Sequence, residues 1–222
     1  MANLNGEKTE HRKPKLAIIF ASTRPGRRGL PIAQWAYNRA AEYGAFDPEL
    51  IDLAEVNLPF MDEPNHPRLR QYTHEHTWAW SGRIDAADAF IIVTPEYNYG
   101  MVAPLKNAID YLHQEWQYKP VGFVSYGGVA AGTRAVQMTK QVVSTLKMVP
   151  LFEAVAIPYF TQHFDEDEQF QPTEAMESSM TAMLNELVRV ETALRPLRAP
   201  AKAPEPRQES PIRDKAPVGA NR

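Results

Sequence analysis

The sequence predicts one α/β domain, built on a doubly wound parallel sheet of five strands with helices on both faces. Short, almost wholly apolar runs alternate along the chain with segments whose apolar residues recur at helical spacing. Strands that are buried on both faces have this continuous apolar character, which is typical of parallel sheets. The length of 222 residues suits a single domain with a sizeable core.

Five segments have the length and composition of strands. The first, residues 15–21, reads Lys-Leu-Ala-Ile-Ile-Phe-Ala, and the third, residues 89–93, reads Ala-Phe-Ile-Ile-Val. The other predicted strands cover residues 46–53, 121–125 and 151–157.

Apolar stripes at helical spacing separate and follow these strands. The first helix is expected to begin near Pro31, whose fixed φ suits a first turn. Residues 66–87 give a mixed pattern, which predicts a loop that leads into a helix. The remaining stripes are Ile32, Trp35, Ala36, Ala40 and Tyr43; Leu105, Ala108, Ile109 and Leu112; Ala135, Met138, Val142, Leu146 and Val149; and Met176, Met180, Met183, Leu184, Leu187 and Leu194.

Both ends of the chain differ in composition from the rest. Residues 196–222 hold six prolines, six basic and three acidic residues and no aromatic residue, too little apolar surface to offset the cost of ordering. We therefore place the domain at residues 15–195, between a flexible N-terminal tail (1–14) and a disordered C-terminal tail (196–222). The tails carry +1 and +3, which leaves about −7 on the domain and argues against nucleic-acid binding.

The chain contains no cysteine. This excludes a disulfide framework, a CxxC redox pair, a cysteine nucleophile and a thiolate zinc site, and it is consistent with a cytoplasmic location. No apolar run approaches 18 residues, and the first 14 residues are polar rather than a signal peptide. We expect a soluble cytoplasmic protein with no membrane partner.

Ligands of doubly wound sheets bind at the carboxyl ends of the strands, so the loops after the first, third and fourth strands are candidate sites. The first loop, residues 22–29, reads Ser-Thr-Arg-Pro-Gly-Arg-Arg-Gly and precedes a helix. Its hydroxyls, guanidinium groups and free backbone N–H groups favour a phosphate site over a solvated basic turn. It matches neither GxxxxGK[ST] nor GxGxxG, which disfavours an ATPase or an ordinary dinucleotide site.

The other two loops suit a flat cofactor. Residues 94–100, Thr-Pro-Glu-Tyr-Asn-Tyr-Gly, offer aromatic faces and an amide to a heterocycle with a polar edge. Residues 125–132, Ser-Tyr-Gly-Gly-Val-Ala-Ala-Gly, allow close backbone approach, and their N–H groups can stabilise an anion. Taken alone, each loop is equally well explained as an ordinary turn.

Together these loops resemble a known family. Residues 95–99, Pro-Glu-Tyr-Asn-Tyr, with Leu-Lys-Asn-Ala-Ile-Asp at 105–110, look like the signature of the NADPH-dependent FMN reductases, which include quinone, azo-dye and chromate reductases. Ser-Thr-Arg at 22–24 and Ser-Tyr-Gly-Gly at 125–128 resemble the other flavin loops of that family. The resemblance covers residues 15–158 and implies a flavodoxin-like fold with strand order 2-1-3-4-5.

The resemblance also implies which residues bind the cofactor. Those expected at the FMN phosphate are Ser22, Arg24, one of Arg27 and Arg28, and Gly29; those beside the isoalloxazine are Pro95, Glu96, Tyr97 and Asn98, with Ser125, Gly127 and Gly128 on its other side. The chain departs from the family at residue 21, an alanine where relatives usually have glycine, and at residues 100–103, where many relatives read Ser-x-Pro-Gly.

The function implied is that of an FMN-dependent NAD(P)H oxidoreductase. Hydride passes from NADPH or NADH to FMN N5, and the electrons then pass to a quinone, azo, flavin or similar acceptor in a ping-pong sequence. No catalytic side chain is assigned, since FMN carries the chemistry, and His74-Glu-His76 lacks a third ligand for a metal site. The family also implies a homodimer or homotetramer, with the helix near Leu105 at its interface.

Two alternatives remain open. One is a flavodoxin-like electron carrier that holds FMN without NAD(P)H activity of its own. Flavodoxins usually have a hydroxyl-rich T/S-x-T-G-x-T loop, which the arginines of residues 22–29 do not match. The other is a binding or regulatory protein that has lost the flavin.

Overall fold

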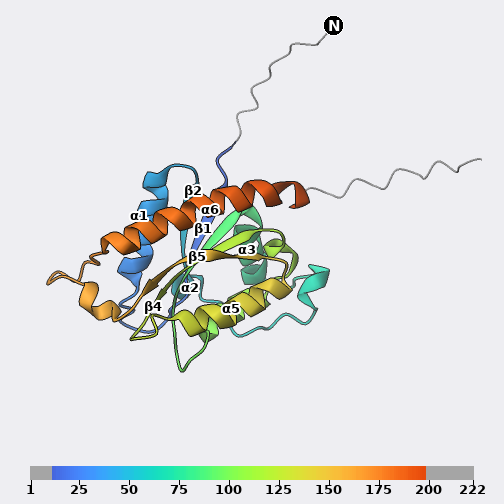
Figure 1. Ribbon diagram of the computed structural model, residues 1–222. Helices are drawn as coiled ribbons and strands as arrows, with labels where there is room; N and C mark the ends of the chain where they lie inside the picture. The colour runs from blue at the N-terminus through green and yellow to red at the C-terminus, as the bar shows by residue number, and fades with distance from the viewer. Residues whose placement is uncertain (1–11, 199–222) are drawn as a thin grey trace, which may run out of the picture.

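Five parallel strands form one sheet in the order β2-β1-β3-β4-β5, the order that the family resemblance implied (Figure 1). The computed structural model describes residues 12–198, so residues 1–11 and 199–222 of the two predicted tails lie outside the described residues. The strands are β1 (Lys15–Phe20), β2 (Asp47–Asp52), β3 (Ala89–Pro95), β4 (Pro120–Tyr126) and β5 (Val149–Ile157).

Helices cover both faces of this sheet (Figure 1). One face packs against α1 (Leu30–Tyr43) and α6 (Glu174–Arg198). The other face packs against α3 (Glu75–Ala86), α4 (Ala103–Asp110) and α5 (Thr133–Thr145). Short turns complete the chain, namely α2 (Leu53–Val56) and the 3₁₀ helices Pro67–Leu69, Gln114–Trp116 and Phe160–His163.

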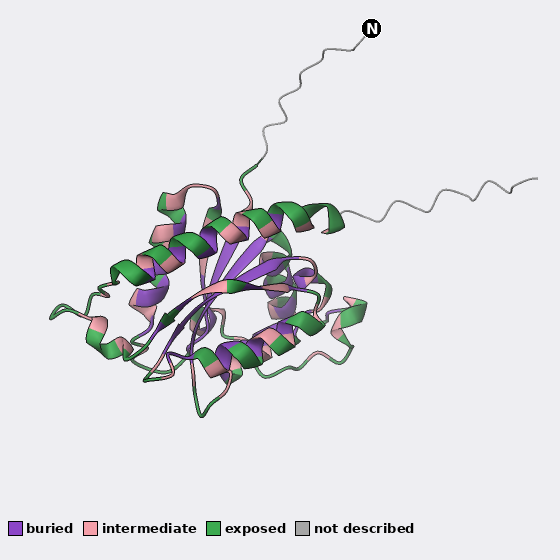
Figure 2. Ribbon diagram, in the orientation of Figure 1, coloured by how far each residue is buried: buried purple, intermediate pink, exposed green. Residues whose placement is uncertain are grey.

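Side-chain alternation along β1 explains why the core is divided in two. Leu16, Ile18 and Phe20 face α1 and α6, whereas Ala17 and Ile19 face the opposite helices. Every residue of β3 is buried, because this strand lies between β1 and β4 and beneath helices on both faces (Figure 2). A continuous apolar sequence is therefore what the central strand requires.

Two element ends differ from the sequence-based expectation. Helix α5 ends at Thr145, the chain turns at Lys147 with a φ of 60°, and Val149 is the first residue of β5 rather than the last of a helical stripe. Helix α6 runs through Pro196 to Arg198, three residues that composition had assigned to the C-terminal tail. The extension is stabilised because Arg195 and Arg198 both bind the buried carboxylate of Glu191.

Within residues 12–198, no helix is long and apolar enough to cross a lipid bilayer. The longest helix, α6, alternates buried methionines and leucines with charged residues. Met176, Met180 and Met183 contribute to the core, as the stripe predicted.

Close packing of α6 on β4 gives a stability test. A Cβ atom at Gly122 would stand 2.6 Å from the Sδ of Met183, which is fully buried. Gly122→Val is expected to lower the free energy of unfolding by about 1–3 kcal/mol, because the added volume displaces α6. Chemical denaturation measures the effect.

Gly82→Ala in α3 is the matched control for this substitution. A Cβ atom there has no neighbour within 4 Å, and alanine is the better helix former, so stability should stay the same or rise by up to about 1 kcal/mol. Equal stabilities for Gly122→Val and the wild-type chain would contradict the packing described here.

Candidate functional site

The register of the sheet brings the three candidate loops to one edge. Phe20 of β1 lies opposite Val93 of β3, and Pro95 of β3 lies opposite Tyr126 of β4. The strands therefore end at nearly the same level, and the segments that follow them surround a cleft of about 400 Å³, which we call the carboxyl-edge cleft. Its lining residues are Ser22, Arg24, Pro25, Gly26, Arg27, Arg28 and Gly29; Pro95, Glu96 and Tyr97; Tyr126, Gly127 and Gly128; and Phe160.

Ten of the twelve predicted cofactor residues line this cleft, and Asn98 and Ser125 do not. Asn98 is exposed and lies in a tight turn, where its φ is 50°. Ser125 is 2% exposed, on the face of the sheet opposite to Tyr126, because neighbouring residues of a strand alternate in direction.

The three arginines of the first loop have different roles. Arg27 Nη1 lies 2.5 Å from both carboxylate oxygens of Asp52, the last residue of β2, so its charge is neutralised within the fold. Arg28 makes a long, exposed contact of 3.4 Å with Glu168. Arg24 has no ion pair with any residue that the structure describes, and it lines the cleft. It is therefore the cation of this loop that can receive an anion.

A hydroxyl pair joins the first loop to the second. Ser22 Oγ lies 3.2 Å from the hydroxyl oxygen of Tyr97, and Ser22 is almost fully buried beneath it. Each hydroxyl can donate one hydrogen bond and accept two, so the pair can still bond a ligand oxygen in the cleft.

Glu96 fixes the second loop to the start of α5. Its carboxylate accepts a hydrogen bond of 3.0 Å from the backbone N–H of Arg134 and also binds the guanidinium of Arg134. Burial alone would raise the pKa of Glu96, but these bonds outweigh it, and the pKa of the carboxyl lies below its usual range. The Arg134 guanidinium in turn stacks on the Tyr99 ring, 3.5 Å from its centroid. Glu96 is thus an anion that shapes the loop.

Tyr126 and the two glycines after it form the third wall. The Tyr126 ring packs on Gly29 at the start of α1, where any side chain would overlap it. The Gly127 N–H donates to the Ile157 carbonyl at 3.2 Å. The prediction that this N–H could stabilise an anion is therefore wrong. The Gly128 N–H has no acceptor among residues 12–198 and remains available.

The sequence analysis missed four residues that shape the site. Tyr126 lies inside the Ser-Tyr-Gly-Gly motif, and Asp52 ends the strand predicted beside β1. Both residues could therefore have been selected from the sequence. Phe160 lines the cleft from a distant segment, and Arg134 binds Glu96 from helix α5. Neither segment carries a motif.

The described residues bring no three histidine, cysteine, aspartate or glutamate side chains together as a metal site. His74 and His76 stack on each other at the start of α3, and His76 lies 3.0 Å from Asp62.

Comparison with known proteins assigns the family. The family described as NADPH-dependent FMN reductase matches residues 14–162, a range that includes all three loops. Over 149 residues the chain is 42% identical to an NAD(P)H-dependent FMN reductase of Schizosaccharomyces pombe, covering 65% of this chain and 74% of that protein. It is 33% identical over 151 residues to an NAD(P)H-dependent FMN reductase of a Nectria species, covering 65% of this chain and 75% of that protein.

The fold has solved counterparts. The flavoenzyme NAD(P)H:(acceptor) oxidoreductase of Paracoccus denitrificans superposes with a TM-score of 0.62 at 18% identity, over 82% of this chain and 98% of that one. This likeness supports the flavodoxin-like architecture, while the sequence matches carry the family assignment. The chain belongs to the NADPH-dependent FMN reductase family.

Proposed function

We propose that this protein is an NAD(P)H-dependent oxidoreductase that holds FMN in the carboxyl-edge cleft. The observation that carries the proposal is the meeting of three separate loops around one cleft in which Arg24 has no carboxylate partner among the described residues. Family membership supports the flavin and the nicotinamide substrate.

The donors of the first loop fit the phosphate of FMN. Arg24 supplies a guanidinium, and Ser22 supplies a hydroxyl. Helix α1 begins beside them with no acidic residue in its first turn and no side-chain cap, so the positive end of the helix is not neutralised. A phosphate dianion is the group that such a set of donors stabilises.

The second and third loops fit a flat ring system. Pro95, Tyr97 and Tyr126 offer apolar and aromatic surface, and the Gly128 N–H can donate to a polar edge of the ring. Glu96 is the one carboxylate lining the cleft in the described part of the chain, and Arg134 neutralises it. A ring that gains negative charge is therefore not repelled.

Bound FMN would supply two-electron transfer from NAD(P)H to an acceptor such as a quinone, an azo compound or a free flavin. The residues of this chain bind the phosphate, orient the ring and stabilise charge at its edge. No side chain is required as a nucleophile or general acid.

We further propose a homodimer or homotetramer that meets near α4. Phe60 is 83% exposed and lies beside an apolar cavity of about 410 Å³, which Leu53, Leu58 and Pro104 also line. A second copy would remove this apolar surface from water.

The first test is the visible spectrum of the purified chain after addition of FMN and gel filtration. We expect a retained flavin band that bleaches promptly when NADPH or NADH is added without oxygen. Retained flavin that neither nucleotide bleaches would indicate an electron carrier. Loss of all flavin on the column would overturn the cofactor assignment.

Arg24→Ala tests the phosphate site. We expect the FMN dissociation constant to rise roughly tenfold to a hundredfold, because a charge-assisted contact of about 1.5–3 kcal/mol is lost. Fluorescence titration with FMN measures it. Arg83→Ala, which removes an exposed arginine paired with Glu49 on the surface, is the matched control. Equal affinities for Arg24→Ala and the control would reject the assignment.

Steady-state kinetics test the order of events. Since both substrates must reach the same ring through the same cleft, we expect them to take turns and give parallel double-reciprocal plots. Plots that intersect would show that a complex with both substrates forms, contrary to a ping-pong sequence.

A further inference from the structure

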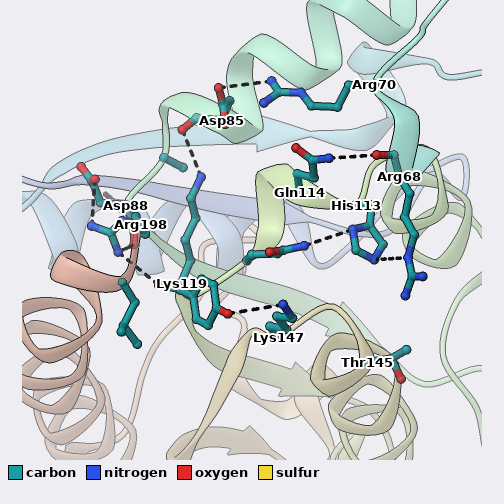
Figure 3. Close-up of a pocket in the computed structure, with 14 residues that line it drawn as sticks. Arg68, Arg70, Asp85, Asp88, His113, Gln114, Lys119, Thr145, Lys147 and Arg198 are labelled. Carbon is teal, nitrogen blue, oxygen red and sulfur yellow. Dashed lines mark hydrogen bonds and ion pairs between the residues drawn. The ribbon is translucent and has the colours of Figure 1, made fainter. Parts of the chain in front are cut away.

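A second and larger cleft lies at the opposite edge of the sheet (Figure 3). It measures about 730 Å³, and we call it the amino-edge cleft, because its walls include Asp88, Lys119 and Lys147, which lie just before β3, β4 and β5. Strand β3 is seven residues long, so at about 3.3 Å per residue the two clefts lie roughly 20 Å apart. No residue lines both clefts.

Positive charge exceeds negative charge on the walls of this cleft. Five arginine and lysine side chains line it, against two aspartates. Carboxylates neutralise two of the five. These contacts are Arg70 with Asp85 at 3.4 Å and with Glu115 at 3.2 Å, and Arg198 with Asp88 at 3.2 Å and with Glu191 at 2.6 Å.

The other three cations, Arg68, Lys119 and Lys147, have no ion pair with any residue between 12 and 198. Arg68 Nε donates to His113 Nε2 at 3.2 Å, and Lys147 Nζ donates to the Tyr118 hydroxyl at 3.3 Å. Neither partner is an anion, so neither contact neutralises the charge of Arg68 or Lys147. In Figure 3 the Lys119 side chain extends toward Asp85, and Lys147 and Arg68 lie on the side away from Asp85.

Lys119 is the buried member of the three. It is 5% exposed, and its ammonium donates to the backbone carbonyls of Ile84 and Asp85 at 2.8 and 3.0 Å. An ammonium has three protons, so one donor is left for a ligand. Burial, with Arg198 nearby, outweighs the attraction of Asp85, Asp88 and Glu115 and lowers the pKa of Lys119 to about 8. A bound anion would stabilise its charged form.

Capping of α3 does not account for this arrangement by itself. Lys119 satisfies two carbonyls at the end of that helix, which explains its two hydrogen bonds. It does not explain why Arg68 and Lys147, from other segments, line the same cleft without carboxylate partners in the described part of the chain.

We propose that the amino-edge cleft binds a phosphate-bearing small molecule of nucleotide size, with Arg68, Lys119 and Lys147 as ligands of the phosphates. Three cations without an ion pair among residues 12–198 match a polyphosphate better than a single carboxylate, which would leave two of them unpaired. The volume lies within the range typical of small-molecule sites, and Gln117 and Thr145 add polar groups for the rest of the ligand. The proposal is independent of the flavin site.

Isothermal titration calorimetry on the full chain tests the ligand chemistry. The probes are pyrophosphate, ATP and adenosine at constant ionic strength. We expect pyrophosphate to bind, ATP to bind at least as tightly and adenosine not to bind. Adenosine that binds as tightly as ATP, or no binding of either phosphate, would overturn the proposal.

Substitutions locate the site. Arg68→Ala and Lys147→Ala, both at exposed positions, should each weaken pyrophosphate binding at least about tenfold. Arg189→Ala, an exposed arginine of α6 outside the cleft, is the control and should leave the affinity unchanged. Lys119→Met removes the buried charge but also the cap of α3, so the first two variants decide the outcome. Affinities unchanged in both would refute the site.

Arg24→Ala separates the two clefts. It should weaken FMN binding and leave pyrophosphate binding as it was. Loss of pyrophosphate binding in this variant would mean that the anion occupies the carboxyl-edge cleft, which would overturn the present proposal while supporting the flavin assignment.

Discussion

Parallel pairing of β3 with β1 on one side and β4 on the other determines where both clefts lie. With this register, every loop that leaves these strands gathers at one edge, and every segment that enters them gathers at the other. A shift of one residue would exchange the two faces of a strand. Tyr126 would then leave Gly29, and Ser125 would take its place. Apolar residues on both faces of β3 resist such a shift, because neither face tolerates exposure.

Some charged side chains around the carboxyl-edge cleft form ion pairs within the fold, and Arg24 does not. Arg27 binds Asp52 and Glu96 binds Arg134, so two loops around the carboxyl-edge cleft are fixed by partly buried ion pairs. Removal of one partner from such a pair leaves an uncompensated charge, which costs more than the pair itself contributes. Arg24 has no such structural partner in the described part of the chain, which is why we propose it as a ligand of the FMN phosphate.

Sequence reasoning recovered the elements whose signal is local. The strands and the main helices follow from apolar periodicity, and the strand order follows from the family resemblance. Motifs directly after strands predicted loops that line one cleft, to which ten of the twelve predicted cofactor residues contribute. It could not recover contacts between distant segments. The Arg27–Asp52 pair spans 25 residues, and the bond that occupies the Gly127 N–H comes from Ile157 on the neighbouring strand. The amino-edge cleft was missed for the same reason, because its cations come from four separate segments without a shared motif.

The position of α6 in the chain has a consequence for biosynthesis. This helix supplies Met176, Met180, Met183, Leu184 and Leu187 to one of the two core layers, and it covers β4 and β5. A ribosome releases the strands before it releases their cover. The part of that face over β4 and β5 therefore stays exposed to water until α6 has emerged, and during that time the nascent chain presents an apolar surface of the kind that makes chaperones necessary. Folding of this domain is completed by its last described helix.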